Sequence, residues 1–147
     1  MKKLVYIGIG GMLLSAAVVL IRIHPIPVKA QAACGVGSLQ GTYAFHLQGW
    51  NVDDQFRAQT PFAEIGSAVA DGSGNMKVEV TLSQGGEIVK LAFDLTYQVN
   101  PDCSGSFTPA PGSQGGPAEF VLGDGGKQMM LISTQPGLVL SGTAVRQ

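Results

Sequence analysis

Two stretches of this sequence alternate between apolar side chains and polar or small ones, and this alternation restricts the folds open to the chain. Residues 76–82 (MKVEVTL) place Met, Val, Val and Leu at every second position, and residues 89–99 (VKLAFDLTYQV) continue the pattern over a longer run. A period of two is typical of a β-strand with one buried and one solvated face. Such strands favour antiparallel pairing, because parallel strands are buried on both faces and lose the alternation.

Glycine-rich turns divide the rest of the sequence into further short strands. Asp-Gly at 71–72 and Gly-Gly at 85–86 supply the positive φ angles that tight hairpins require. In residues 62–70 the apolar side chains of Ile65 and Val69 are expected on the inner face. The additional strand-like segments are residues 42–48, 62–70, 106–110, 118–123, 127–134 and 138–146.

An antiparallel meander of about eight strands predicts an all-β fold closed into a small barrel, because closure removes both exposed edges. The interior of such a barrel is either filled by side chains or wide enough for one small ligand. Residues 109–119 (PAPGSQGGPAE) predict a loop, either near a barrel mouth or elsewhere on the surface. Trp50 is expected over a mouth or as an aromatic plug of the core. The ligand-lining candidates are Tyr43, Phe45, Trp50, Phe93, Tyr97, Phe120 and Met129.

The segment 1–32 has the three parts of a secretory signal peptide. Lys2 and Lys3 precede an uncharged apolar run at 4–21, and Ala-Gln-Ala at its end is a small-x-small cleavage site. We therefore expect a secreted or periplasmic protein whose single domain covers residues 33–147.

Two other fates of this segment stay open. The apolar run approaches the roughly 20 residues that span a bilayer, so the segment could be retained as an anchor. Cys34 could instead carry a lipid, although Gln31 stands where a lipoprotein signal has an aliphatic residue. If the segment is cleaved, no stable membrane span is expected to remain.

Cleavage would change the charge of the protein. Of the nine Lys and Arg residues, four lie in residues 1–32, whereas all ten Asp and Glu residues follow, so the net charge would move from −1 to −5. Phosphate binding needs basic patches, and none survives the cut. The composition therefore argues against nucleic acid as a partner, and it leaves the oligomeric state open.

Cys34 and Cys103 are the two cysteines of the sequence. An even number of cysteines in a small secreted domain predicts a disulfide, and here one pairing exists. Their sequence separation of 69 corresponds to a chain-entropy stabilisation of about 4 kcal/mol. A metal or redox site is the alternative, but neither cysteine has a second Cys or a His at ligand spacing. We expect no metal and no cofactor.

Candidates for catalytic chemistry are few. His46 is the one histidine after the leader, and the alternation turns it away from Tyr43 and Phe45. Glu64 and Glu119 have the parity of outer-face residues, unless a bulge reverses their strands. A carboxylate turned into an apolar barrel would have a raised pKa and could act as an acid or a base. We name no catalytic residue, and keep these two glutamates as polar candidates for the lumen.

Several motifs resemble a known group of proteins. Residues 39–49 (LQGTYAFHLQG), 65–76 (IGSAVADGSGNM), 95–107 (LTYQVNPDCSGSF) and 120–147 look like small exported bacterial proteins of unassigned function. That group is similar to the allene oxide cyclase and dirigent superfamily, which implies an eight-stranded antiparallel barrel with an apolar lumen. The shared motifs are mainly turns and strand starts over residues 34–147. No catalytic set of allene oxide cyclase can be placed on this sequence, so its activity does not transfer.

Two functions from different classes follow. The first is non-enzymatic binding of a small apolar ligand or of a protein partner in the cell envelope. The second is a cyclase or isomerase whose apolar lumen folds a flexible substrate and acts mainly through proximity. Ligand binding and catalysis in the lumen both need an open lumen. A filled barrel would exclude them, and so would a lumen smaller than the usual ligand pocket, which exceeds about 300 Å³.

Overall fold

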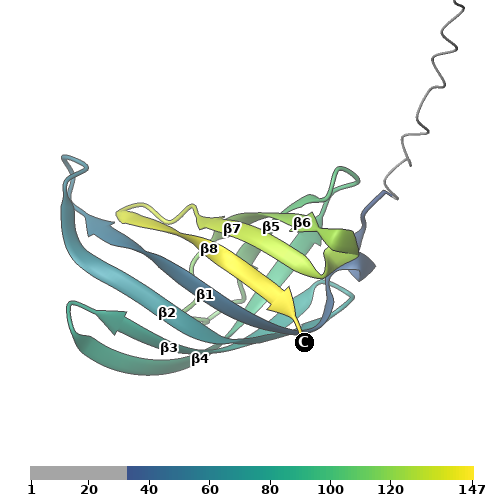
Figure 1. Ribbon diagram of the computed structural model, residues 1–147, viewed down its shortest axis with the longest axis horizontal. Helices are drawn as coiled ribbons and strands as arrows, with labels where there is room; N and C mark the ends of the chain where they lie inside the picture. The colour runs from purple at the N-terminus through teal and green to yellow at the C-terminus, as the bar shows by residue number, and fades with distance from the viewer. Residues whose placement is uncertain (1–32) are drawn as a thin grey trace, which may run out of the picture. The chain divides into compact units, whose positions relative to one another are not determined.

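The computed structural model describes residues 33–147, which form one closed barrel of antiparallel strands in chain order (Figure 1). Strand β1 pairs with both β2 and β8, and this second pairing closes the barrel. The predicted all-β meander of eight strands is confirmed. The predicted signal peptide, residues 1–32, lies outside the described residues. The strands are β1 (Gln40–Val52), β2 (Ala58–Asp71), β3 (Asn75–Gln84), β4 (Glu87–Val99), β5 (Ser104–Pro109), β6 (Ala118–Gly123), β7 (Gln128–Ser133) and β8 (Leu138–Arg146).

Strands β3 and β4 show how the alternation builds the barrel wall. The two strands pair along their whole lengths, with Val78 opposite Phe93 and Met76 opposite Leu95, so that the apolar members of each pair share the inner face. A Gly-Gly turn joins them, and Gly85 has the positive φ of 59° that was expected there. The two clearest sequence patterns therefore form one hairpin of the wall.

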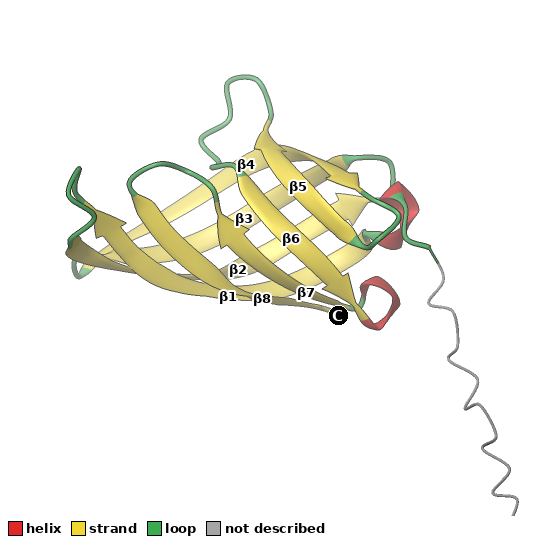
Figure 2. Ribbon diagram, turned by 90° about the horizontal axis from the view of Figure 1, so that it is seen from above, coloured by secondary structure: helices red, strands yellow, loops and turns green. Residues whose placement is uncertain are grey.

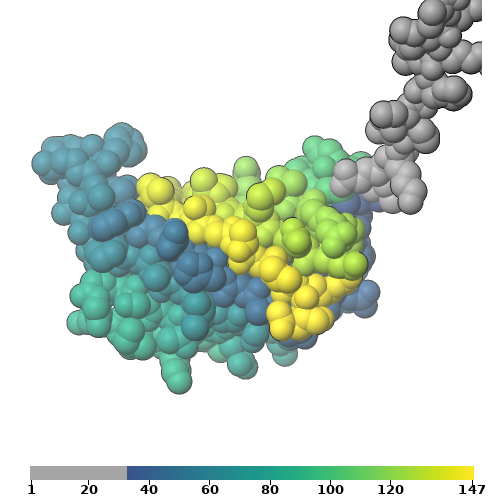
Figure 3. Space-filling view, viewed as in Figure 1, coloured from purple at the N-terminus to yellow at the C-terminus, as the bar shows by residue number. Residues whose placement is uncertain are grey.

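The two ends of the barrel are built differently. The connections β2–β3, β4–β5 and β6–β7 lie at one end together with the C-terminus, and the other four connections lie at the opposite end (Figure 2). Strands β1 to β4 have 10 to 14 residues, whereas β5, β6 and β7 have six each. The longer strands extend past the shorter ones at the opposite end, where the β1–β2 loop projects furthest (Figure 3).

Two short 3₁₀ helices cover the end that holds the C-terminus, which we call the sealed end. They are η1 (Val36–Ser38), before β1, and η2 (Asp124–Gly126), between β6 and β7. The helices are in contact, because a Cβ on Gly126 would overlap the carbonyl oxygen of Ser38. Leu39, which follows η1, has no exposed surface and lies in the hydrophobic core.

Two tyrosine hydroxyls tie this cover to the barrel wall. Tyr43 on β1 donates to the carbonyl oxygen of Gly126 at 2.6 Å, and Tyr97 on β4 donates to that of Leu39 at the same distance. Both bonds are buried and join segments far apart in the sequence. Burial raises the pKa of both phenols, so they remain neutral donors at physiological pH.

The predicted disulfide joins Cys34 to Cys103 and is confirmed. It holds the chain before η1 against the β4–β5 turn, with the two Cα atoms 4.9 Å apart. The backbone N–H of Cys34 also donates to the carbonyl oxygen of Pro101 at 3.2 Å. The bridge therefore fixes the segment that covers the sealed end.

Strand β2 faces the opposite way from the prediction. Ile65 is 60% exposed and Val69 is 50% exposed on the outer face, while Glu64 points inward. No bulge causes this, because the β1–β2 register is continuous along these positions. The reason is space: Gly66 faces inward under the ring of Phe45, where a Cβ would lie 2.7 Å from the ring carbon Cζ. Small residues of β2 thus make room for bulky neighbours.

Candidate functional site

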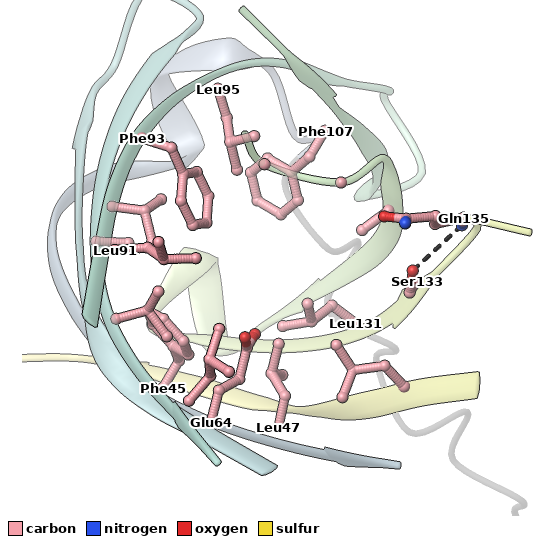
Figure 4. A pocket seen from close by; sticks show the side chains of 18 of the residues that line it. Phe45, Leu47, Glu64, Leu91, Phe93, Leu95, Phe107, Leu131, Ser133 and Gln135 are labelled. Atoms are coloured by element: carbon pink, nitrogen blue, oxygen red, sulfur yellow. Dashed lines mark hydrogen bonds between the residues drawn. The ribbon is translucent and has the colours of Figure 1, made fainter. Parts of the chain in front are cut away.

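A cavity of about 420 Å³ occupies the barrel between the sealed end and the open end. Side chains from all eight strands line it, and most of them are aliphatic or aromatic. Phe45, Leu91, Phe93, Phe107 and Leu131 surround the space from different sides (Figure 4). The barrel is therefore not filled, and an apolar molecule could replace solvent in this space.

Four of the seven ligand-lining candidates border the cavity: Tyr43, Phe45, Phe93 and Met129. Each lies on the inner face of its strand. Tyr43 and Met129 are buried, whereas Phe45 and Phe93 are partly exposed and pack against the core from the cavity side. These four residues therefore connect the packed core to the open space.

Tyr97 and Phe120 face inward but do not line the cavity, contrary to the prediction. Both belong to the packed core, with exposures of 4% and 3%. Phe120 packs on Phe107 with their ring centroids 4.5 Å apart, and Tyr97 also meets Phe107, edge-on. Their places near the sealed end put them beneath the floor of the cavity.

Trp50 and Glu119 lie on the outer face. Trp50 is therefore neither over a mouth nor a plug of the core, contrary to the prediction. The parity of Glu119 predicted its outer position correctly, and its candidacy for the lumen is wrong. Trp50 is 47% exposed and sits opposite Pro61 in the β1–β2 register. Its position on β1 has the same parity as the exposed His46, which explains the outward direction. Glu119 is exposed and lies opposite Ser106 and Ile132 on the neighbouring strands.

Glu64 is the one carboxylic acid that borders the cavity. It lies opposite Leu47 on β1 and Leu82 on β3, so both strand neighbours present aliphatic side chains to the same space. Its carboxyl oxygens point into the lumen (Figure 4). Burial raises the pKa of Glu64 from its ordinary 4.5 to about 7. The carboxyl can therefore gain or lose a proton near neutral pH.

Uncharged polar side chains gather towards the open end of the cavity. They are Asn51, Gln84, Gln114, Ser133 and Gln135. The backbone N–H of Gln135 donates to the Ser133 hydroxyl at 3.2 Å. The amide nitrogen Nδ2 of Asn51 is buried and has no hydrogen-bond partner within the described residues. A bound molecule could accept a hydrogen bond from it.

The loop between β5 and β6 forms part of the cavity wall. Gly115 packs closely on Phe93 and Leu95, since a Cβ there would lie 2.7 Å from a carbon of each side chain. The loop is anchored at both ends, where Ala110 N–H donates to the Asp94 carbonyl oxygen and the Pro117 carbonyl oxygen accepts from Thr134. Of the two places predicted for this loop, the one near a mouth is correct.

The sequence reasoning missed the polar side chains at the open end. A signal for Asn51 was available, because it has the same parity on β1 as Tyr43, Phe45 and Leu47. The strand was expected to end before it, so the alternation was not extended. Gln114 lies in an irregular loop, where no periodicity applies.

Some kinds of site are missing from the described part of the chain. Across residues 33–147, no three His, Cys, Asp or Glu side chains are grouped closely enough to hold a metal ion. In the same range no helix has both the length and the apolar character needed to cross a membrane. No known protein family and no curated protein matches this sequence. The cavity and its lining are therefore the features from which a function can be inferred.

Proposed function

We propose that this protein binds a small, largely apolar molecule inside its barrel without transforming it. The observation that carries the proposal is the cavity of about 420 Å³, within the range of about 300–1,000 Å³ that is usual for ligand pockets. Such pockets combine an apolar lining with a few polar groups that orient the ligand. The inner faces of the strands supply the first, and Glu64 and Asn51 supply the second.

We further propose that binding takes place outside the cytoplasm. The signal-like segment 1–32 and the disulfide support this location, because disulfides form and persist mainly in oxidising compartments. An eight-stranded antiparallel barrel is also what the resemblance to the allene oxide cyclase and dirigent superfamily requires, and we keep that relationship as a proposal. A periplasmic or secreted carrier of apolar molecules would agree with all three features.

A cyclase or isomerase is the second candidate, and Glu64 favours it. A general acid or base works best when its pKa lies near the working pH, and burial raises that of Glu64 to about 7. The cavity holds no second carboxyl or histidine within the described lining that could take the complementary role. We therefore place the enzyme second.

The test uses native mass spectrometry and dye displacement on the exported, oxidised protein with a panel of lipids and terpenoids. Ala68→Phe would fill the cavity from β2, and Leu91→Trp would fill it from β4. The matched control, Ala63→Phe, adds the same ring to the outer face of β2. We expect either filling variant to weaken binding by about tenfold or more, the equivalent of 1.4 kcal/mol, and the control to bind normally.

A check of folding accompanies this test, because a variant that misfolds would also lose binding. Each variant is first checked for the near-UV circular dichroism and cooperative unfolding of the native protein, and only folded variants are compared. The ligand-binding proposal is wrong if no member of the panel binds the native protein. It is also wrong if a folded filling variant binds as tightly as the control. Conversion of a bound compound that Glu64→Gln abolishes would favour the enzyme instead.

A further inference from the structure

We propose that the ligand is a cation: an apolar molecule with one protonated amine, which forms an ion pair with the Glu64 carboxylate inside the barrel. This inference rests on the proposed binding function and adds the chemical class of the ligand. It is carried by the position of a single carboxyl in an otherwise uncharged cavity.

Glu64 is held in the lumen by the pairing of β2, not by any polar contact. Its two strand neighbours, Leu47 and Leu82, also line the cavity, and Phe93 and Phe107 project from the opposite side (Figure 4). The register prevents β2 from rotating, because a shift by one residue would bring Ile65 inward against packed neighbours. The carboxyl therefore stays inside whether or not a ligand is present.

No group of the described chain neutralises this carboxyl. No Lys, Arg or His nitrogen in residues 33–147 lies within 4.0 Å of it. Among the residues that line the cavity, the one other titratable side chain is Tyr43, whose hydroxyl is already bonded to Gly126 at the sealed end. Arg57 pairs with Asp53 in the β1–β2 loop instead. The counter-charge of Glu64 is therefore left to a ligand.

The energetics favour a cation over an anion or a neutral molecule. An unpaired carboxylate in an apolar site is costly, and this cost is the cause of the raised pKa of Glu64. An ammonium group beside it would offset the cost and form a charge-assisted hydrogen bond. A fatty acid would instead bring a second carboxylate into the same space, which is unfavourable for both charges.

The charge around the open end points the same way. The connections there contain Asp53 and Asp54 against one cation, Arg57, and Glu87 begins β4 beside them. The net charge of residues 33–147 is −5, since five Lys and Arg oppose ten Asp and Glu. A negative surface raises the local concentration of cations and lowers that of anions. An amine would reach the cavity more readily than an acid of the same size.

The test uses three matched probes that differ in one group: 4-phenylbutylamine, 4-phenylbutanol and 4-phenylbutanoic acid. Calorimetry at pH 8 measures their affinities for the native protein, for Glu64→Gln, and for the control Glu119→Gln, which alters the outer face. We expect the native protein to prefer the amine to the alcohol by about tenfold, and the acid to bind weakest. Glu64→Gln should remove the preference for the amine, whereas the control should keep it.

The pH dependence gives a second readout. Because Glu64 must lose its proton to pair with an ammonium, the affinity for the amine should rise between pH 6 and pH 8, and binding near pH 7 should release a proton. Equal binding of amine and alcohol would overturn this inference and leave the ligand-binding proposal standing. Preferred binding of the acid would also overturn it. Failure of all three probes would overturn it as well, and the lipid and terpenoid panel decides the binding proposal separately.

Discussion

The two ends of the barrel treat buried polar groups in opposite ways. At the sealed end, the hydroxyls of Tyr43 and Tyr97 each donate a short hydrogen bond to a backbone carbonyl. At the open end, the Asn51 amide nitrogen lacks a partner within the described residues, and the Glu64 carboxyl has no counter-charge there. Buried polar groups in proteins are normally satisfied, so the exceptions need an explanation.

The difference indicates that the two ends of the barrel have different roles, one in stability and the other in ligand binding. The sealed end combines the disulfide, two 3₁₀ helices and the aromatic core, all of which stabilise the fold. The open end has a cavity, the unpartnered amide of Asn51 and the Glu64 carboxyl without a counter-charge, which cost stability but are useful to a ligand. Local violations of packing rules are expected where a protein functions. Variants at the two ends should therefore have opposite effects on stability.

The largest effect is expected at the sealed end. Replacing both cysteines, Cys34→Ser and Cys103→Ser, should lower the free energy of unfolding by about 4 kcal/mol, because the bridge closes a long loop in the unfolded chain. Urea denaturation of the variant and of the native protein measures this. A loss below about 1 kcal/mol would contradict the chain-entropy argument.

The same variant also tests whether the stability of the sealed end affects ligand binding at the open end. At temperatures where it remains folded, it should bind ligand like the native protein, because the bridge lies beyond the floor of the cavity. Chemical reduction of the native protein is the matched control and should reproduce the loss of stability. Loss of binding in a folded variant would show that the two ends are coupled.

Glu64→Gln at the open end is expected to raise the free energy of unfolding, whereas loss of the disulfide lowers it. The folded-state pKa of about 7 exceeds the ordinary 4.5, so the folded protein holds a proton that the unfolded chain releases between these values. The native protein should therefore lose stability as the pH rises from 4.5 to 7. Above pH 7 the variant should be more stable by about 2 kcal/mol, since water at the open end reduces the full penalty.

Urea denaturation of both proteins between pH 4 and pH 8 checks this. Below pH 4.5 the two should be equally stable, because Glu64 is then protonated in both the folded and the unfolded state. Taking the difference between variant and native protein removes the contribution of Asp71, whose pKa is lowered by hydrogen bonds from Asn75 and Ser73. Glu119→Gln serves as the outer-face control. If the difference in free energy of unfolding between the two proteins does not vary with pH, Glu64 is not a group whose pKa is raised in the folded state.

The sequence predicts the fold better than the site, and strand β2 shows why. In β3 and β4 the bulky apolar side chains lie inside, so alternation gives the correct face. In β2 the inner positions after Glu64 hold Gly66, Ala68 and Ala70, and the bulky Ile65 lies outside. Hydrophobicity alone selects the wrong face there, because the space is filled by Phe45 from the neighbouring strand.

The candidate site depends on that same inversion. Glu64 lies in the lumen because β2 has this orientation, and no rule based on a single strand could have placed it there. The pairing of small inner residues on one strand with large ones on the next can be recognised only when the register is known. Trp50 illustrates the reverse error: its size suggested a buried place, but its parity on β1 sets it outside.

The smallest predicted effects compare single polar groups at the two ends. Tyr97→Phe removes the hydroxyl bonded to the Leu39 carbonyl oxygen and should lower the free energy of unfolding by about 1 to 2 kcal/mol, because that oxygen is left buried and unpaired. Asn51→Leu removes an amide that has no partner and should raise it by about 1 kcal/mol. Urea denaturation at pH 7 measures both. If Asn51→Leu also weakens ligand binding while Tyr97→Phe does not, the unsatisfied amide belongs to the binding site. If both variants destabilise the protein equally, the two ends do not differ in how their buried polar groups are satisfied.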